Sequence, residues 1–167
     1  MGQDHLTTQR LTLRPVSERD AGPIARLIGD LAVARWLTHV PHPYAEADAV
    51  DFIARHRDAP ATYAITLANA LIGCVSLRAE LGYWLGVPYW GRGYATEAAR
   101  AVLAAHFGAR GTSVRSGYHE GNDASRNVLT KLGFVPDGVD VQTVRSLGSS
   151  VNVLKMRLTR AAWRAAA

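Results

Sequence analysis

The fold of this chain is decided by residues 80–107, E-L-G-Y-W-L-G-V-P-Y-W-G-R-G-Y-A-T-E-A-A-R-A-V-L-A-A-H-F. The first part is rich in the aromatic and branched residues of a strand, and from Tyr94 onward apolar residues recur with helical spacing. Gly91 and Gly93 lie between the two parts. Glycines let the backbone approach a ligand closely, and the free N–H groups of a first helical turn attract an anion. The stretch therefore predicts a strand, a glycine turn and a helix that together hold a phosphate group.

Two common phosphate-binding signatures do not fit this turn. A nucleotide P-loop needs a lysine directly after its last glycine, whereas Tyr94 follows Gly93 here. A dinucleotide fingerprint needs a third glycine or alanine and an acidic residue about 20 residues further on. Thr96 takes the third position, and residues 111–114 offer no acid. The ligand must therefore be identified from another part of the chain.

Length and composition indicate one ordinary globular domain, residues 1–167. The chain is 48% hydrophobic and 20% charged, which suits a single domain with a sizeable core. No apolar run approaches the ~20 residues needed to cross a bilayer, so no membrane partner is expected. The formal net charge is +5, but the basic residues are scattered. We therefore expect no nucleic-acid partner, while a scattered positive field would attract a small polyanionic cofactor.

The single cysteine, Cys74, lies in the apolar run L-I-G-C-V-S-L. A lone cysteine excludes an internal disulfide and fits a cytoplasmic location, where thiols stay reduced. We interpret Cys74 as a small core residue. A role as an acyl-accepting nucleophile is the alternative, although no histidine is near it in sequence.

Periodicity and turn residues divide the chain into strands and helices. Strands are expected at residues 10–16, 62–67, 71–78, 80–85, 114–118, 134–142 and 152–158. Helices are expected from Asp20, at 31–37, 45–57 and 94–107, and from about Asp123, with a loop at 41–44 and a surface or frayed tail at 159–167. Hairpins combined with two strand–helix–strand units predict an α/β fold with a mixed sheet.

Four motifs occur in a fixed order along the chain. They are R-L-T-L-R-P (10–15), E-L-G-Y-W-L (80–85), W-G-R-G-Y-A-T-E-A (90–98) and N-D-A-S-R-N-V-L-T-K-L-G-F (122–134). Together they resemble the GNAT superfamily of acyl-CoA-dependent N-acetyltransferases, in particular the bacterial branch of RimJ/RimL-type ribosomal-protein N-terminal acetyltransferases. The resemblance implies the GNAT fold, a single mixed, mostly antiparallel sheet splayed at the acetyl-CoA site and flanked by helices.

The resemblance also implies acetyl-CoA as co-substrate and no metal. The pyrophosphate would lie on the N–H groups of residues 91–95, and the pantothenate arm would pair with the splayed strand at 85–87. The implied cofactor-binding residues are Leu85, Val87, Gly91, Arg92, Gly93, Tyr94, Ala95, Thr96, Asn122 and Ser125. As alternatives, Trp90 and Tyr94 could be packing residues, and Glu97 could simply complement the helix N-terminus.

Transfer of an acetyl group to an amine requires a base that keeps the amine neutral. Glu80 is the candidate, since it lies on the strand where the histone-acetylating members of the superfamily carry their catalytic glutamate. His119 and Glu120 are alternative bases. A solvent-facing strand carboxylate is the competing interpretation of Glu80.

The departing thiolate requires a proton. Many superfamily members use a tyrosine on the short helix after the asparagine motif, but Leu129 stands there. Ser125 matches the serine of the RimL-type motif and is the candidate donor. Helix capping by Asp123 or Ser125 is the competing interpretation.

The resemblance implies that a primary amine, either a peptide N-terminus or a small molecule, attacks the thioester directly in a ternary complex. The candidate acceptor-binding residues are Trp36, His42, Tyr44, Tyr83 and Trp84, all of which could also be ordinary packing residues. The alternative function is a non-catalytic acyl-CoA-binding sensor, prompted by the missing tyrosine and by the missing acid near the turn, where residues 86–88 are G-V-P. The protein is expected to be a monomer or a homodimer.

Overall fold

The strand, turn and helix expected within residues 80–107 are all present in the computed structural model, which describes residues 5–59 and 61–166. Strand β5 (Leu81–Leu85) leads through the 3₁₀ helix η2 (Val87–Tyr89) into the turn, and helix α4 (Tyr94–Gly108) follows directly. Gly91 and Gly93 have φ angles of 72° and 79°. Residues with a side chain rarely adopt such angles, which explains the two glycines.

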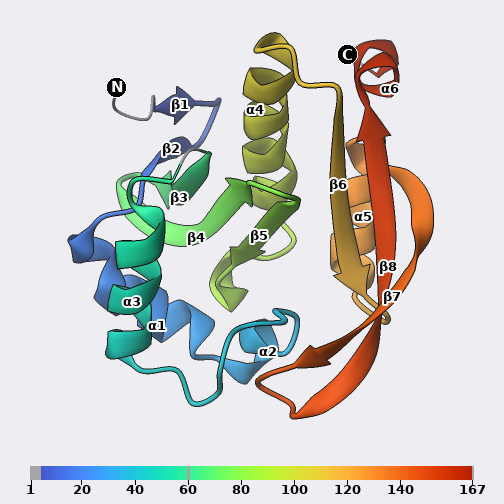
Figure 1. The fold of residues 1–167 in the computed structure, drawn as a ribbon. Helices are drawn as coiled ribbons and strands as arrows, with labels where there is room; N and C mark the ends of the chain where they lie inside the picture. Colours follow the sequence, from blue (N-terminus) through green and yellow to red (C-terminus); the bar gives the residue numbers. More distant parts are fainter. Residues whose placement is uncertain (1–4, 60, 167) are drawn as a thin grey trace.

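The strands form two hydrogen-bonded groups, and every ladder in the described part of the chain is antiparallel (Figure 1). The first group has the order β1-β2-β3-β4-β5 and adds β1 (Leu6–Thr7), β2 (Thr12–Pro15), β3 (Thr62–Leu67) and β4 (Ala70–Leu77) to β5. The second has the order β6-β8-β7 and contains β6 (Ser113–His119), β7 (Val135–Val144) and β8 (Ser149–Thr159).

The sheet is split between β5 and β6. No backbone ladder joins these two strands within residues 5–59 and 61–166. Instead, the buried hydroxyl of Ser116 on β6 donates a hydrogen bond to the carbonyl oxygen of Leu81 on β5, at 2.8 Å. The free edge of β5 therefore faces a gap, which is the splay that the sequence predicted.

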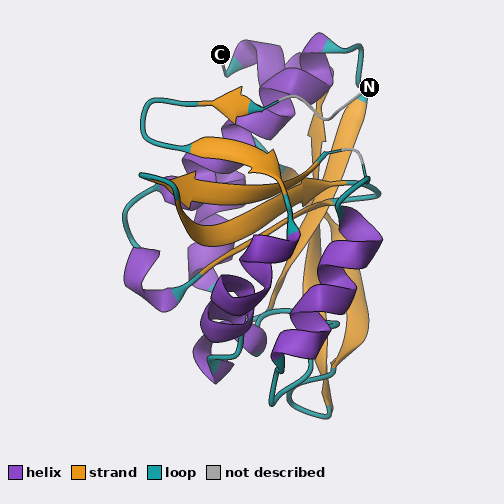
Figure 2. Cartoon of the chain, turned by 90° about the vertical axis from the view of Figure 1, so that its left-hand side faces the viewer, coloured by secondary structure: helices purple, strands orange, loops and turns teal. Residues whose placement is uncertain are grey.

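Helices pack on both sides of the strands (Figure 2). Helices α1 (Ala21–Ile28) and α3 (Glu46–His56) bury residues such as Ile24 and Ile53 against one side. Helix α4 buries Leu103 against the larger core on the other side. The remaining helices are η1 (Glu18–Asp20), α2 (Leu31–Ala34), α5 (Asp123–Lys131) and α6 (Arg160–Ala165). No described helix is long and apolar enough to cross a membrane.

A buried ion pair fixes the start of α1. The guanidinium of Arg14 donates two hydrogen bonds to the carboxylate of Asp20, at 2.8 and 2.7 Å, and the backbone N–H and hydroxyl of Ser17 donate to the same carboxylate. Burial raises the pKa of Asp20, but these hydrogen bonds outweigh it and hold the pKa below its ordinary value. Strand β2 and helix α1 are thereby joined at one point.

Several expectations about element boundaries were wrong. The helix expected at 31–37 ends at Ala34, because the chain turns so that Thr38 can reach the second sheet. Strand β5 starts after Glu80 and ends at Leu85, so Val87 belongs to a 3₁₀ helix and not to the splayed strand. The two-residue β1 was not expected. The tail, expected as surface or frayed helix, does form a helix, α6, and its Trp163 stacks on Phe107 with 5.6 Å between the ring centroids.

Candidate active site

A cavity of about 1070 Å³ lies at the splay between β5 and β6. Its walls come from the glycine turn, β5, β6, the start of α5 and the segment from α1 to α3. Cavities of this kind are the usual location of ligand sites in proteins. The splay therefore provides a space that residues from both halves of the fold can reach.

The glycine turn forms one wall of the cavity. Gly91, Gly93, Tyr94, Ala95 and Thr96 all line it. A Cβ atom built on Gly91 would have no other atom within 4 Å, so the backbone there is open to a ligand. Since α4 begins at Tyr94, its free N–H groups and positive dipole end favour an anion at this wall.

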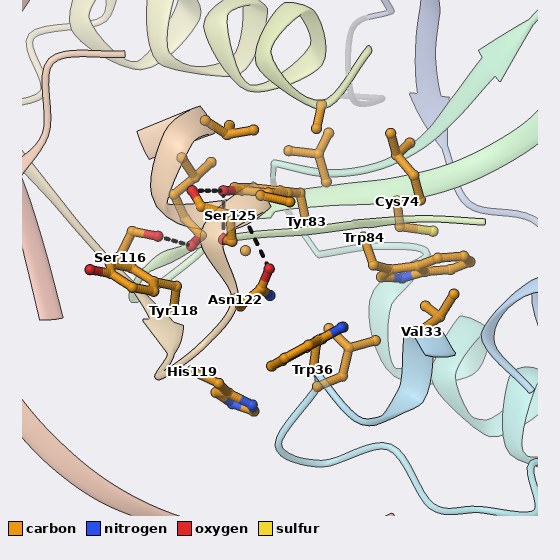
Figure 3. A pocket seen from close by; sticks show the side chains of 18 of the residues that line it. Val33, Trp36, Cys74, Tyr83, Trp84, Ser116, Tyr118, His119, Asn122 and Ser125 are labelled. Atoms are coloured by element: carbon orange, nitrogen blue, oxygen red, sulfur yellow. Dashed lines mark hydrogen bonds between the residues drawn. The ribbon is translucent and has the colours of Figure 1, made fainter. Parts of the chain in front are cut away.

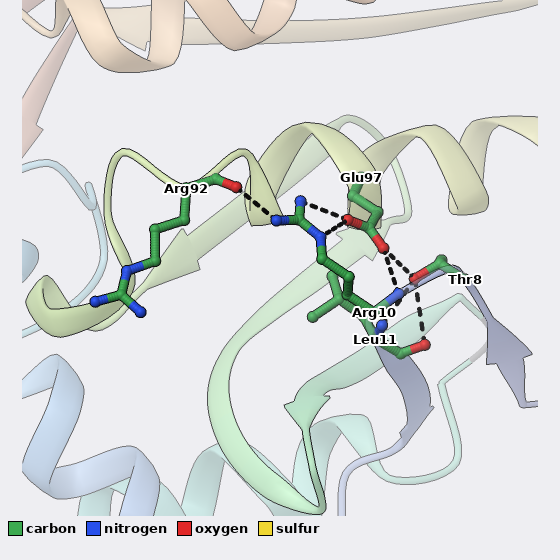
Figure 4. Close-up of polar contacts among 5 residues, drawn as sticks. All are labelled: Thr8, Arg10, Leu11, Arg92 and Glu97. Carbon is green, nitrogen blue, oxygen red and sulfur yellow. Dashed lines mark hydrogen bonds and ion pairs between the residues drawn. The ribbon is translucent and has the colours of Figure 1, made fainter.

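A clamp on the back of the turn fixes its position (Figure 4). The carboxylate of Glu97, in the first turn of α4, accepts hydrogen bonds from the hydroxyl of Thr8 and from the backbone and side chain of Arg10. The Arg10 guanidinium also donates to the carbonyl of Arg92 at 3.0 Å and lies over the ring of Tyr94. Burial raises the pKa of Glu97, but these hydrogen bonds lower it more. Glu97 is therefore a structural anchor as well as a helix N-terminal acid.

Helix α5 brings Ser125 to the cavity. Asn122 caps this helix, because its side-chain oxygen accepts a hydrogen bond from the N–H of Ser125 at 3.2 Å. Capping by Asp123 or Ser125 was therefore the wrong interpretation, and the hydroxyl of Ser125 is left for another partner. That partner is Tyr83 on β5, whose hydroxyl oxygen lies 2.9 Å away (Figure 3).

Tyr83 is a neutral hydrogen-bonding group at physiological pH. Burial raises its pKa to about 12, although the hydrogen bond with Ser125 lowers it slightly. The sequence placed Tyr83 in the acceptor wall, whereas its hydroxyl meets the proposed proton donor. Leu129, at the position of the superfamily tyrosine, is fully buried in the core and does not line the cavity.

Glu80 lies just before β5 and lines the cavity together with Lys155 of β8. Its carboxylate accepts a hydrogen bond from the Lys155 ammonium at 2.5 Å. The Glu80 side chain is 42% exposed. Glu80 is therefore a partly exposed carboxylate with a cationic partner from the other sheet, and neither of the two interpretations made from the sequence included that partner.

His119 ends β6 in a chain of hydrogen bonds. The amide nitrogen of Gln142 donates to Asp140, so its oxygen accepts from the hydroxyl of Thr38. The Thr38 oxygen, which is 3.2 Å from Nε2 of His119, must then accept a hydrogen bond from the N–H of that nitrogen. Burial lowers the pKa of His119, although the backbone of Arg35 raises it in part, so the ring is neutral at pH 7. Glu120, the other alternative base, is exposed and bonds Asn152 outside the cavity.

The acceptor-wall residues expected from the sequence separate into two groups. Trp36, Tyr44 and Trp84 line the cavity, as Tyr83 does, but His42 is exposed and lies outside it. The neighbouring His39 and Val40 line it instead, because the loop turns His42 toward solvent. Among the expected cofactor residues, the side chain of Arg92 is exposed and neither Arg92 nor Val87 lines the cavity.

Other lining residues were not singled out from the sequence. Phe52 and His56 of α3 reach the cavity, and their rings stack with 4.4 Å between the ring centroids. Lys155 and Gln142 come from the C-terminal hairpin. The helical stripe containing Phe52 could have indicated a buried face, but nothing in the sequence indicated that this face would meet β5. Within the described residues, no group of three or more His, Cys, Asp or Glu side chains could hold a metal ion.

Comparison with known proteins identifies the family to which this chain belongs. The model of the acetyltransferase (GNAT) domain family matches residues 10–135. The chain therefore belongs to the GNAT acetyltransferase family, and the α/β fold, with its antiparallel strands splayed between β5 and β6, agrees with that assignment.

Individual relatives agree with the RimJ/RimL-like resemblance. The chain is 27% identical over 147 residues to the "Putative ribosomal N-acetyltransferase YdaF" of Bacillus subtilis (strain 168), covering 78% of this chain and 80% of the relative. A GNAT acetyltransferase from Bacillus anthracis has a similar structure, with a TM-score of 0.84 at 18% identity over 95% of this chain and 99% of that one. Mycobacterium smegmatis RimJ in complex with CoA-disulfide has a TM-score of 0.80 at 21% identity, over 95% and 90% of the two chains.

Proposed function

We propose that this domain transfers an acetyl group from acetyl-CoA to a primary amine by direct attack in a ternary complex. One observation carries the proposal: a single cavity brings together an open, anion-binding turn, the free edge of a strand and the hydroxyl of Ser125. The CoA-disulfide complex of the structurally similar RimJ supports the choice of cofactor. In this proposal the N–H groups of residues 91–95 and the hydroxyl of Thr96 bind the pyrophosphate, and Asn122 and the edge of β5 hold the pantothenate arm.

The chemistry of the transfer is balanced by two protons. The amine nitrogen forms a bond to the acetyl carbon, and the carbon–sulfur bond breaks. The neutral amine loses one proton to Glu80, directly or through water, and Glu80 then releases it to solvent. The thiolate receives a proton from the hydroxyl of Ser125, which regains one from solvent. A carboxylate is a much weaker base than an amine, as the ordinary pKa values of the two kinds of group show.

A weak base is sufficient only for an amine that loses its proton readily. At pH 7 an α-amine of pKa ~8 needs about 1.4 kcal/mol to become neutral, whereas a lysine side chain of pKa ~10.4 needs about 4.6 kcal/mol. An α-amine, or an amine whose pKa is lowered by burial, therefore suits this site better than an exposed lysine side chain.

The protonation state of Cys74 favours direct attack by the amine over a mechanism with an acetyl-cysteine intermediate. This residue lines the cavity, but burial raises the pKa of its thiol, so it is not present as the nucleophilic thiolate. Initial rates measured against both substrates should consequently give intersecting rather than parallel double-reciprocal lines, and Cys74→Ala should retain activity.

The proposal is tested by incubating the purified protein with acetyl-CoA and a panel of primary amines. Free thiol should appear in step with acetylated amine, measured by a thiol reagent and by mass spectrometry. Acetyl-CoA binding without thiol release for any peptide, polyamine or arylalkylamine would contradict the transfer reaction. That result would instead favour a non-catalytic acyl-CoA-binding module.

A further inference from the structure

Strand β5 divides the cavity into two sides. Tyr83 packs with the core beneath α4 and contacts Ser125, whereas the next residue, Trp84, packs with the core formed by α1 and α3. Successive side chains of a strand point to opposite faces, so this alternation separates two environments. The proposed cofactor contacts lie on the Tyr83 side, which leaves the Trp84 side to the amine.

The Trp84 side of the cavity is apolar and aromatic. Cys74 pairs with Trp84 across the β4–β5 ladder, and Val33, Trp36 and Phe52 line the cavity as well. Figure 3 shows Trp84, Cys74, Val33 and Trp36 grouped away from the Tyr83–Ser125 contact. A ligand group that fills this space contacts mainly aromatic and aliphatic side chains, with the Tyr44 hydroxyl and the His56 ring as polar neighbours, so an apolar group suits it best.

Acidic side chains are scarce along this cavity. Glu80 and Asp123 are the only carboxylates among its described lining residues. Glu80 is paired with Lys155, and Asp123 lies 3.4 Å from Arg126 at the start of α5. On the acceptor side the Arg35 guanidinium lies over the ring of Trp36, with 4.9 Å to the ring centroid. A second ammonium group on the acceptor would therefore find no unpaired negative charge here.

We infer that the acceptor is a primary amine close to an aromatic or branched apolar group, which enters the space between Trp36 and Trp84. This inference rests on the proposed acetyl transfer. Burial of the apolar group provides binding energy, and desolvation favours the neutral form of the nearby amine, which the transfer reaction requires. Such a group can belong to a small arylalkylamine or to a peptide with a hydrophobic first residue.

The first experiment compares kcat/KM among acceptors with acetyl-CoA in excess. The arms are phenethylamine, ethylamine, spermidine, and two short peptides that differ only in beginning with Phe or Ser. We expect kcat/KM for phenethylamine to exceed the values for ethylamine and spermidine by at least about tenfold. If the natural acceptor is a protein N-terminus, kcat/KM for the Phe peptide should also exceed that for the Ser peptide. A value for spermidine or ethylamine that equals or exceeds that of phenethylamine would overturn the inference while leaving acetyl transfer established.

A pair of tryptophan variants tests the location. Trp84→Leu should raise KM for phenethylamine about tenfold, while KM for acetyl-CoA and for ethylamine stays within about twofold. Trp163→Leu is the matched control, because Trp163 is also a partly buried tryptophan but lies outside the cavity. Equal effects of the two variants on phenethylamine would overturn the assignment of the acceptor to the Trp84 side.

If no acceptor releases thiol, the proposed transfer fails, and binding still decides the inference. Calorimetry with CoA present should then detect phenethylamine at concentrations where spermidine gives no signal, and Trp84→Leu should abolish that signal. Binding of spermidine alone, or no binding of either amine, would overturn the inference.

Discussion

The hydroxyl groups of Tyr83 and Ser125 lie 2.9 Å apart, so β5 and α5 meet through a pair of side chains that each carry one proton. The Tyr83 hydroxyl is also 3.3 Å from the carbonyl oxygen of Ser125. If Tyr83 donates to the Ser125 hydroxyl, the serine proton is free to point into the cavity. The high pKa of Tyr83, about 12, keeps its proton in place over the usual assay range. Tyr83 is thus suited to direct the serine proton and not to supply one.

This arrangement predicts that Tyr83 and Ser125 act as a unit. Ser125→Ala should lower kcat about 100-fold, the loss of a proton donor, and Tyr83→Phe about 2- to 10-fold, the loss of one hydrogen bond. The double variant should be no slower than Ser125→Ala alone, because residues in contact are not additive. Steady-state kinetics with acetyl-CoA check this. Losses that multiply in the double variant would show that the contact has no part in catalysis.

Glu80→Gln is predicted to lower kcat while the Kd of CoA stays unchanged. Glutamine preserves the size of the side chain and can still accept the hydrogen bond from Lys155, but it cannot accept the amine proton. The fall in rate should be largest at low pH, where less of the amine is neutral. Glu120→Gln is the control, since Glu120 lies outside the cavity. An unchanged pH–rate profile in Glu80→Gln would exclude Glu80 as the base.

Gly91→Ala is predicted to weaken CoA binding about tenfold or more, because the added methyl group enters open space at the proposed phosphate site. The positive φ also costs about 1 kcal/mol of stability. Gly148→Ala separates the two effects, because Gly148 has a similar φ of 64° and an equally open Cβ position in the β7–β8 hairpin. Calorimetry should show CoA affinity lost only in Gly91→Ala. Equal affinities would contradict the assignment of the cradle.

Asp20→Asn is predicted to lower the free energy of unfolding by about 3–5 kcal/mol, because it leaves the buried guanidinium of Arg14 without its charged partner. The pKa of Asp20 is lowered in the native state, so its contribution is fully present above the ordinary carboxyl pKa. That contribution should disappear as the pH falls through the lower native pKa. Denaturant melts at pH 7 and in this acidic range measure both effects. Asp58→Asn, at a 93% exposed side chain, should change neither.

The sequence was most informative where local chemistry determines structure. Gly91 and Gly93 indicated the turn, and the periodicity after them indicated α4. The start of α1 directly after Asp20 was also visible, because an acidic residue preceded an apolar helical pattern. The N-terminal strand β1 was missed, since two residues carry too little pattern for such a prediction.

Contacts between distant residues could not be predicted in the same way. Tyr83 and Ser125 are 42 positions apart, and Glu80 and Lys155 are 75 positions apart. Whether either pair meets depends on how β5, α5 and β8 cross, which no local motif records. For the same reason Tyr83 was assigned to the acceptor wall and His42 to the cavity, although the loop after His39 turns His42 outward.

The clamp between Arg10 and Glu97 has a consequence for the free-energy cost of the proposed CoA binding. It joins the short β1–β2 turn to a helix 87 positions further along the chain, and neither residue lines the cavity. Because these contacts fix the turn from within the protein, a ligand need not spend binding energy on ordering it. The Arg10–Glu97 contacts therefore brace the turn from behind, and breaking them would weaken the proposed binding of CoA without deleting any group that lines the cavity.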